Sequence, residues 1–85
     1  MSESRTVRVR LFAIARQLAG RELVELALPP KATVAELRIA LAAAEPKLAP
    51  ILPHVLFSIN AEYGNDRSLI PPDAEVACIP PVSGG

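Results

Sequence analysis

Hydrophobic and polar residues alternate without a break over residues 6–12, TVRVRLF. The positions that fall together on one face are Val7, Val9 and Leu11. Because successive side chains of a strand point to opposite faces, this pattern predicts a half-buried strand. The opposite face carries Arg8 and Arg10 and must be solvated, since unpaired charges are costly to bury. Phe12 falls on the solvated face, so we expect it to be exposed.

The next two segments predict a short helix and a second strand. Residues 13–20, AIARQLAG, suit about two helical turns, and Gly20 can end them in the left-handed conformation that glycine favours after a helix. Residues 22–28, ELVELAL, alternate again, and their buried face would consist of Val24, Leu26 and Leu28. The pair Pro29–Pro30 ends this strand, because proline has no backbone N–H to donate.

A capping box opens the main predicted helix. Thr33 and Glu36 have the T-x-x-E spacing, in which each side chain binds the backbone N–H of the other residue. Apolar residues follow at helical spacing and predict a core-facing stripe of Val34, Leu37, Ala40, Leu41 and Ala44. Pro46 ends the helix, and the proline-broken residues 47–54 predict an irregular turn.

The rest of the chain predicts three more strands. Residues 55–59 form the first, with Val55, Phe57 and Ile59 on one face. The turn-rich stretch after them predicts a chain reversal at residues 64–66, and residues 69–76 predict a short edge strand and another turn.

The last strand begins at Glu75. Val76 and Cys78 would face the core, and the opposite face would carry Glu75, Ala77 and Ile79. Asp73 lies in the turn before this strand, where aspartate tolerates a left-handed conformation better than most residues.

This order of elements predicts an α+β fold. One main helix can cover only one face of a mixed sheet, and a chain that returns to end in a strand can place its first and last strands side by side at the centre. The arrangement is that of a β-grasp, or ubiquitin-like, fold. We expect residues 1–85 to form a single domain, with residues 82–85 as a flexible tail.

Composition excludes several classes of function. The chain has 85 residues, of which 51% are hydrophobic, so it can form one small folded domain. Nine basic and nine acidic residues cancel, which argues against binding to nucleic acid or a membrane surface. A single cysteine and the lack of an apolar leader favour a cytoplasmic location.

The chain ends in PPVSGG. Glycine has no side chain to bury and the greatest backbone freedom to lose, so Gly84 and Gly85 contribute little to packing. This ending can be a frayed terminus, or it can carry a working carboxylate on a tail slim enough to enter a narrow active site. A Gly-Gly ending alone leaves both interpretations open.

Longer stretches of the sequence are more specific than the Gly-Gly ending. The opening VRVRLFAIARQLAG, the capped helix and SINAEYGNDRSLIPPDAEVACIPPVSGG resemble the small, sulfur-carrying subunit of molybdopterin synthase. The resemblance covers residues 7–85, and PPVSGG is its most specific part. The sulfur carrier of thiamin synthesis is similar and also ends in Gly-Gly, but it lacks the opening RLFAIAR. The turn that commonly has the sequence DGDEV in the family has Asp73 in place of the glycine.

The resemblance implies a function for the terminus. An ATP-dependent adenylyltransferase of the ubiquitin-activating type would adenylate the carboxylate of Gly85, and sulfur from a donor protein would then replace AMP. The resulting thiocarboxylate, on the slim tail that includes Gly84, would supply sulfur to cyclic pyranopterin monophosphate to build the dithiolene of molybdopterin. The chain would bind no permanent cofactor and no metal, and the catalytic residues would lie on the large subunit.

The resemblance also implies a partner surface. The carrier would bind the large synthase subunit, in an assembly of two copies of each. The contact positions would be Phe12, Tyr63, Ile79, Pro80, Pro81, Val82 and Ser83.

Two other residues could carry chemistry. Cys78 could accept sulfur, but its position beside Val76 favours a role as a small core residue. His54 has no ligand cluster near it in the sequence, which argues against a metal site.

Other functions stay open from the sequence alone. The chain could serve another sulfur pathway, such as thiamin synthesis, or be joined through Gly85 to lysines of other proteins. It could also be a β-grasp interaction module with an inert tail.

Overall fold

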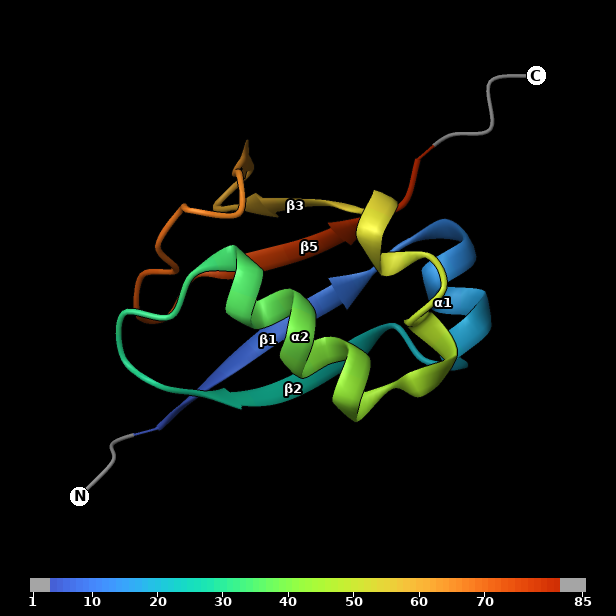
Figure 1. Ribbon diagram of the computed structural model, residues 1–85, viewed down its shortest axis with the longest axis horizontal. Helices are drawn as coiled ribbons and strands as arrows, with labels where there is room; N and C mark the ends of the chain where they lie inside the picture. The colour runs from blue at the N-terminus through green and yellow to red at the C-terminus, as the bar shows by residue number, and fades with distance from the viewer. Residues whose placement is uncertain (1–3, 82–85) are drawn as a thin grey trace.

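The computed structural model describes residues 4–81. A five-stranded mixed sheet forms one layer, and helix α2 crosses one face of it (Figure 1). The strands are β1 (Arg5–Leu11), β2 (Leu23–Leu28), β3 (Leu56–Ile59), β4 (Glu62–Tyr63) and β5 (Glu75–Ile79). The helices are α1 (Ala13–Ala19), α2 (Val34–Ala44) and the 3₁₀ turns η1 (Pro46–Leu48) and η2 (Leu52–His54).

The first and last strands are neighbours at the centre of the sheet, as the sequence predicts. The strand order is β2-β1-β5-β3-β4, and β1 and β5 are parallel, with Val9 opposite Val76 and Leu11 opposite Cys78. The other pairs are antiparallel. This topology confirms the predicted β-grasp fold.

The main helix begins at the predicted capping box. The Thr33 hydroxyl accepts the Glu36 N–H at 3.3 Å, and the Glu36 carboxylate accepts the Thr33 N–H at 3.2 Å. Three of the predicted stripe residues are fully buried: Val34, Leu37 and Leu41. Ala40 is half-buried against the core, but the prediction for Ala44 is wrong, because it is exposed. The chain turns after α2, and Leu48 of η1 enters the core instead.

The link between β1 and β2 follows the prediction with a shift of one residue. Strand β1 ends at Leu11, and Phe12 is the N-cap of α1 rather than a strand residue. Gly20 ends α1 with a φ of 73°, and its N–H binds the carbonyl of Arg16. A left-handed φ of this kind is the reason for a glycine at this position.

The turn after β3 differs from the sequence prediction. The chain reverses at Asn60 and Ala61, and the short strand β4 follows directly, so the reversal comes earlier than predicted. A further turn, in which the Ser68 N–H binds the Asn65 carbonyl at 2.9 Å, overlaps the predicted residues 64–66. The short edge strand predicted in 69–76 is reduced to a single bridge. Asn60 and Ala61 have φ values of 51° and 69°, which is the pattern of a two-residue type I′ hairpin. Within 69–76 the structure has an isolated bridge from Leu69 and a turn in which Asp73 is left-handed, at φ 59°, as predicted.

Arg38 on α2 joins three segments that are distant in the sequence. Its guanidinium donates hydrogen bonds to the carbonyls of Leu52 and Val55, at the two ends of η2, and pairs with Asp66 at 2.9 Å. The same group lies 5.0 Å from the centre of the Phe57 ring. Arg38 therefore fixes η2, the start of β3 and the loop after β4 against the helix.

Candidate functional site

The face of the sheet opposite α2, which we call the open face, is largely exposed. In β1 and β2 the residues on this face alternate with core residues, as the burial patterns of both strands show. Arg8 and Arg10 lie on it, exposed as predicted. The open face also contains Leu23, Glu25, Leu56, Ser58, Tyr63, Glu75, Ala77 and Ile79.

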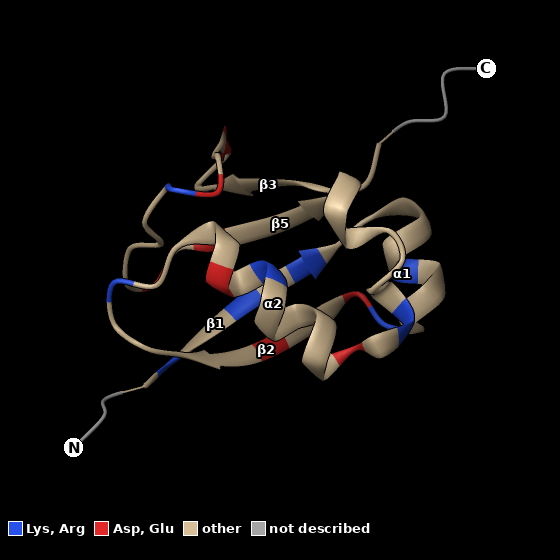
Figure 2. Ribbon diagram, viewed as in Figure 1, with Lys and Arg blue, Asp and Glu red and all other residues tan. Residues whose placement is uncertain are grey.

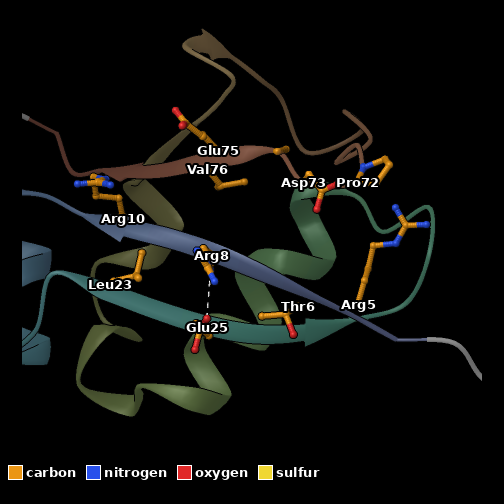
Figure 3. Close-up of a pocket in the computed structure, with 11 residues that line it drawn as sticks. Arg5, Thr6, Arg8, Arg10, Leu23, Glu25, Pro72, Asp73, Glu75 and Val76 are labelled. Carbon is orange, nitrogen blue, oxygen red and sulfur yellow. Dashed lines mark hydrogen bonds and ion pairs between the residues drawn. The ribbon is translucent and has the colours of Figure 1, made fainter.

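One half of the open face is charged. A depression of about 730 Å³ is lined there by residues that include Arg5, Arg8, Glu25, Asp73 and Glu75. Figure 3 shows these side chains along β1, β2 and β5 and in the turn before β5. The pair between Arg8 and Glu25, at 3.2 Å, bridges β1 and β2. Both members of this pair are exposed, so it adds little to stability. Figure 2 shows basic residues on β1 and an acidic residue on the adjacent β2, so the two signs lie side by side and this half has no dominant charge.

The other half, around the end of β5, is apolar, and we call it the apolar end. It consists of Phe12, Leu56, Tyr63 and Ile79. Phe12, Leu56 and Tyr63 are 44%, 54% and 69% exposed. Ile79 is half-buried and lies opposite Leu56 in the β3–β5 pairing. Apolar side chains gathered in this way on a small domain mark an interaction surface more often than scattered ones do.

The structure therefore brings the three predicted contact residues Phe12, Tyr63 and Ile79 to the same half of one face. Sequence reasoning missed Leu56. A signal was present, since the predicted core-facing set Val55, Phe57 and Ile59 implies that Leu56 points the other way.

The base of the predicted tail follows directly from the central strand. Pro80 is buried in the domain and Pro81 is exposed. Pro80 is thus an internal anchor for the segment that leaves β5, and Pro81 is the first of the predicted contact residues after β5 that is exposed. The predicted site residues Val82, Ser83, Gly84 and Gly85 lie outside the described residues.

Cys78 is a core residue, as predicted. It is fully buried opposite Phe57 and Leu11. Burial raises the pKa of its thiol from 9.0 to about 11, an effect that the positive charge of Arg38 reduces only in part. A thiol with this pKa is un-ionised at neutral pH and is a poor nucleophile. This environment is unsuited to a sulfur relay.

Replacing Cys78 by Ala should cost about 1–2 kcal/mol at neutral pH. The wild-type thiol also makes stability depend on pH. Between about pH 9 and 11 the unfolded thiol loses its proton while the folded one keeps it, so unfolding is favoured by about 1.4 kcal/mol per pH unit. Chemical denaturation of both proteins should show the advantage of wild type shrinking through this window. A constant difference would contradict the assignment.

Residues 4–81 were also compared with what a metal site and a membrane-spanning helix require. These residues contain no group of three or more His, Cys, Asp or Glu side chains placed to hold a metal ion, and His54 is exposed at the end of η2. Nor do they contain a helix long and apolar enough to span a membrane.

Solved structures share this architecture. SAMP1, the small archaeal modifier protein 1 of Haloferax volcanii, is 28% identical with a TM-score of 0.84, and the match covers 95% of this chain and 100% of that one. A Pyrococcus furiosus protein assigned as molybdopterin converting factor, subunit 1, is 27% identical with a TM-score of 0.79, over 91% and 98% of the two chains. The shared fold thus places the protein among the ubiquitin-like β-grasp carriers.

Sequence comparison narrows this class of β-grasp proteins to one family. Residues 9–85 match the ThiS family, and the chain belongs to that family. The molybdopterin synthase sulfur carrier subunit of Arabidopsis thaliana is 34% identical over 79 residues, which are 93% of this chain and 82% of the relative. These matches confirm the resemblance identified from the sequence.

Proposed function

We propose that this chain is the sulfur carrier subunit of a molybdopterin synthase and works through a thiocarboxylate at Gly85. The observation that carries the proposal is the match to the ThiS family, which extends through Gly85, together with the 34% identity to a sulfur carrier of molybdopterin synthase. The fold adds support, because the segment that leads to Gly85 leaves the central strand beside the apolar end.

The proposed chemistry needs activation of the terminal carboxylate. A carboxylate is a weak electrophile, so an adenylyltransferase would first join it to the α-phosphate of ATP and release pyrophosphate. A persulfide of a donor protein would then attack the acyl carbon through its outer sulfur and release AMP, which leaves an acyl disulfide. A second thiol would attack the donor's sulfur, form a disulfide with it and release the thiocarboxylate. Glycine at positions 84 and 85 gives the acyl carbon the narrow, unbranched path that these steps require.

The globular domain would supply the binding energy. Ordering a tail residue costs about 1–2 kcal/mol, so residues 82–85 cannot hold the complex together by themselves. The apolar end surrounds the start of this segment and is the surface on this face suited to hydrophobic burial against the large subunit. In this role the chain is a donor subunit, and the catalytic residues belong to its partner.

A second function is favoured by one observation. The structural match to SAMP1 of Haloferax volcanii, a small archaeal modifier protein, supports attachment of Gly85 to lysine amines of other proteins. The same activated terminus could serve both reactions, because a lysine amine and a sulfur nucleophile attack the same acyl carbon.

Intact-mass analysis of the protein from its native host tests the proposal. The carrier function requires a fraction whose mass has increased by the exchange of one oxygen for one sulfur, located at Gly85 by fragmentation. A population found only as conjugates to lysine would select the modifier function. An unmodified terminus in cells that are actively making molybdopterin would contradict both.

A substitution at Phe12 tests docking separately from the proposed chemistry at Gly85. Truncating a buried aromatic anchor often costs about 2 kcal/mol in binding, so Phe12→Ala should weaken association with the large subunit about 30-fold. Because Phe12 is exposed in the isolated domain, the melting temperature should barely change. Calorimetric titration and a thermal melt measure the two quantities. An unfolded variant, or one with unchanged affinity, would remove Phe12 from the interface.

A further inference from the structure

A hollow of about 190 Å³ lies on the open face between the charged half and the apolar end. Its lining includes Arg10, Phe12, Ser58, Ala61, Glu75 and Ala77. The hollow exists because two small side chains, Ser58 and Ala77, are directly opposite one another in the β3–β5 pairing. The next pair on the same face, Leu56 with Ile79, is large. A local gap between larger neighbours results.

We propose that this hollow receives one apolar side chain of the large subunit. This inference rests on the proposed function and adds a specific contact to it. Its volume is below the roughly 300 Å³ at which small-molecule sites begin, so it suits a single large side chain. The lining combines small residues, the apolar side chains of Phe12 and Ala61, and the charged side chains of Arg10 and Glu75. Apolar contacts bordered by polar groups are typical of an interface pocket.

The short distance between the hollow and Gly85 favours the large subunit as the occupant of the hollow. Four residues separate Pro81 from Gly85 and span at most about 14 Å, so a partner that takes Gly85 into its active site must approach Pro81 to within that distance. Ala77 lies about 13 Å back from Pro81 along the same strand direction. The hollow is also continuous with the apolar end through Phe12, which borders both.

The backbone at Ala61 gives independent support. Ala61 has a φ of 69° in a two-residue hairpin whose second position favours glycine, so its methyl group is held at a cost in stability. Two hydrogen bonds fix the turn in place, one from the Asn60 N–H to the Glu75 carbonyl at 2.8 Å and one from the Glu75 N–H to the Asn60 side chain at 2.9 Å. The result is a methyl group placed rigidly at the edge of the hollow, where a partner side chain would contact it.

Filling the hollow tests the proposal. Ala77→Leu should weaken binding to the large subunit at least about 10-fold, because overpacking a closely fitted contact typically costs 1–3 kcal/mol. The matched control is Ala27→Leu, which makes the same change at an exposed position of β2. This position lies on the open face of the sheet but outside the hollow. The control should bind like wild type. Equal affinity of Ala77→Leu and Ala27→Leu would overturn the inference.

Ala61→Gly tests the same contact without adding bulk. It removes one methyl group, so affinity should fall about four-fold, the equivalent of about 0.8 kcal/mol for a buried carbon, while the melting temperature is not lowered. Unchanged affinity would contradict the role of this methyl group even if Ala77→Leu fails to fold.

The proposed function and the hollow would fail in different ways. Failure of the wild-type chain to bind the large subunit would refute the proposed function itself. Binding by wild type together with normal binding by both hollow variants would refute only the hollow. The wild-type chain could instead self-associate through the hollow. If it does, and Ala77→Leu loses self-association but binds the large subunit normally, the hollow belongs to a second copy of this chain and the proposal is overturned.

Discussion

Deletion of Gly85 is expected to abolish sulfur transfer and leave the fold unchanged. The proposed reactions take place at the carboxyl carbon of Gly85, and deletion would move that carbon back by one residue, about 3.5 Å, and place it on Gly84. Reacting atoms must be aligned at contact distance, and a displacement of about 1 Å can already cost two orders of magnitude in rate. A reconstituted assay with activating enzyme, sulfur donor and large subunit measures the transfer.

Adding one residue after Gly85 is the complementary test, because it keeps every residue and moves only the terminal carboxylate. This variant should also be inactive. Both variants should melt at the wild-type temperature, since the core consists of residues between Val7 and Cys78. Molybdopterin formation by either variant at the wild-type rate would show that the terminal carboxylate is not the working group.

The second large effect is expected at Arg38. Arg38→Met keeps an unbranched apolar stem but removes the guanidinium. The Val55 carbonyl then has no donor, the Leu52 carbonyl keeps only the Val55 N–H, at 3.2 Å, and Asp66 is released. A buried acceptor without a partner costs about 1–3 kcal/mol, and only the Val55 carbonyl is left in that state, so the loss in unfolding free energy should be about 2 kcal/mol. Loss of the contact with the Phe57 ring adds to this.

An exposed ion pair provides the matched control for Arg38. Arg16 and Glu22 approach to 3.6 Å with both side chains well exposed, so Arg16→Met should change stability by less than about 0.5 kcal/mol. Urea denaturation of both variants measures the difference. If Arg38→Met is no less stable than Arg16→Met, the guanidinium does not hold the three segments together.

Local patterns predicted most of the fold correctly. The alternation around Val9, the capping box at Thr33 and the glycine after α1 each depend on residues close in the sequence, and each is found in the structure. The predicted exposure of Phe12 and burial of Cys78 follow from the same alternation. Periodicity is enough where one face of an element is buried and the other is wet.

The errors have a common physical origin. The reversal after β3 was predicted at residues 64–66 because glycine is common in turns, but the hairpin uses the Asn60–Ala61 pair, which the hydrogen bonds to Glu75 hold in place. Arg38 gave no local signal, because its partners are separated from it by 14 to 28 positions. The hollow depends on which residue of β3 is opposite Ala77, and that register is set by the whole sheet.

The parallel pairing of β1 with β5 also governs when the domain can form during synthesis. Until β5 has emerged from the ribosome, β1 and β2 on one side and β3 and β4 on the other have no strand to join them into one sheet. Cooperative folding must therefore wait for nearly the whole chain, which is the slow regime expected for contacts of high sequence separation. Gly85 lies only a few residues beyond β5, so it has been added before β5 is free to pair. Under the proposed function, the terminal carboxylate and the folded domain would therefore become available to a partner together, and an incomplete chain would offer neither.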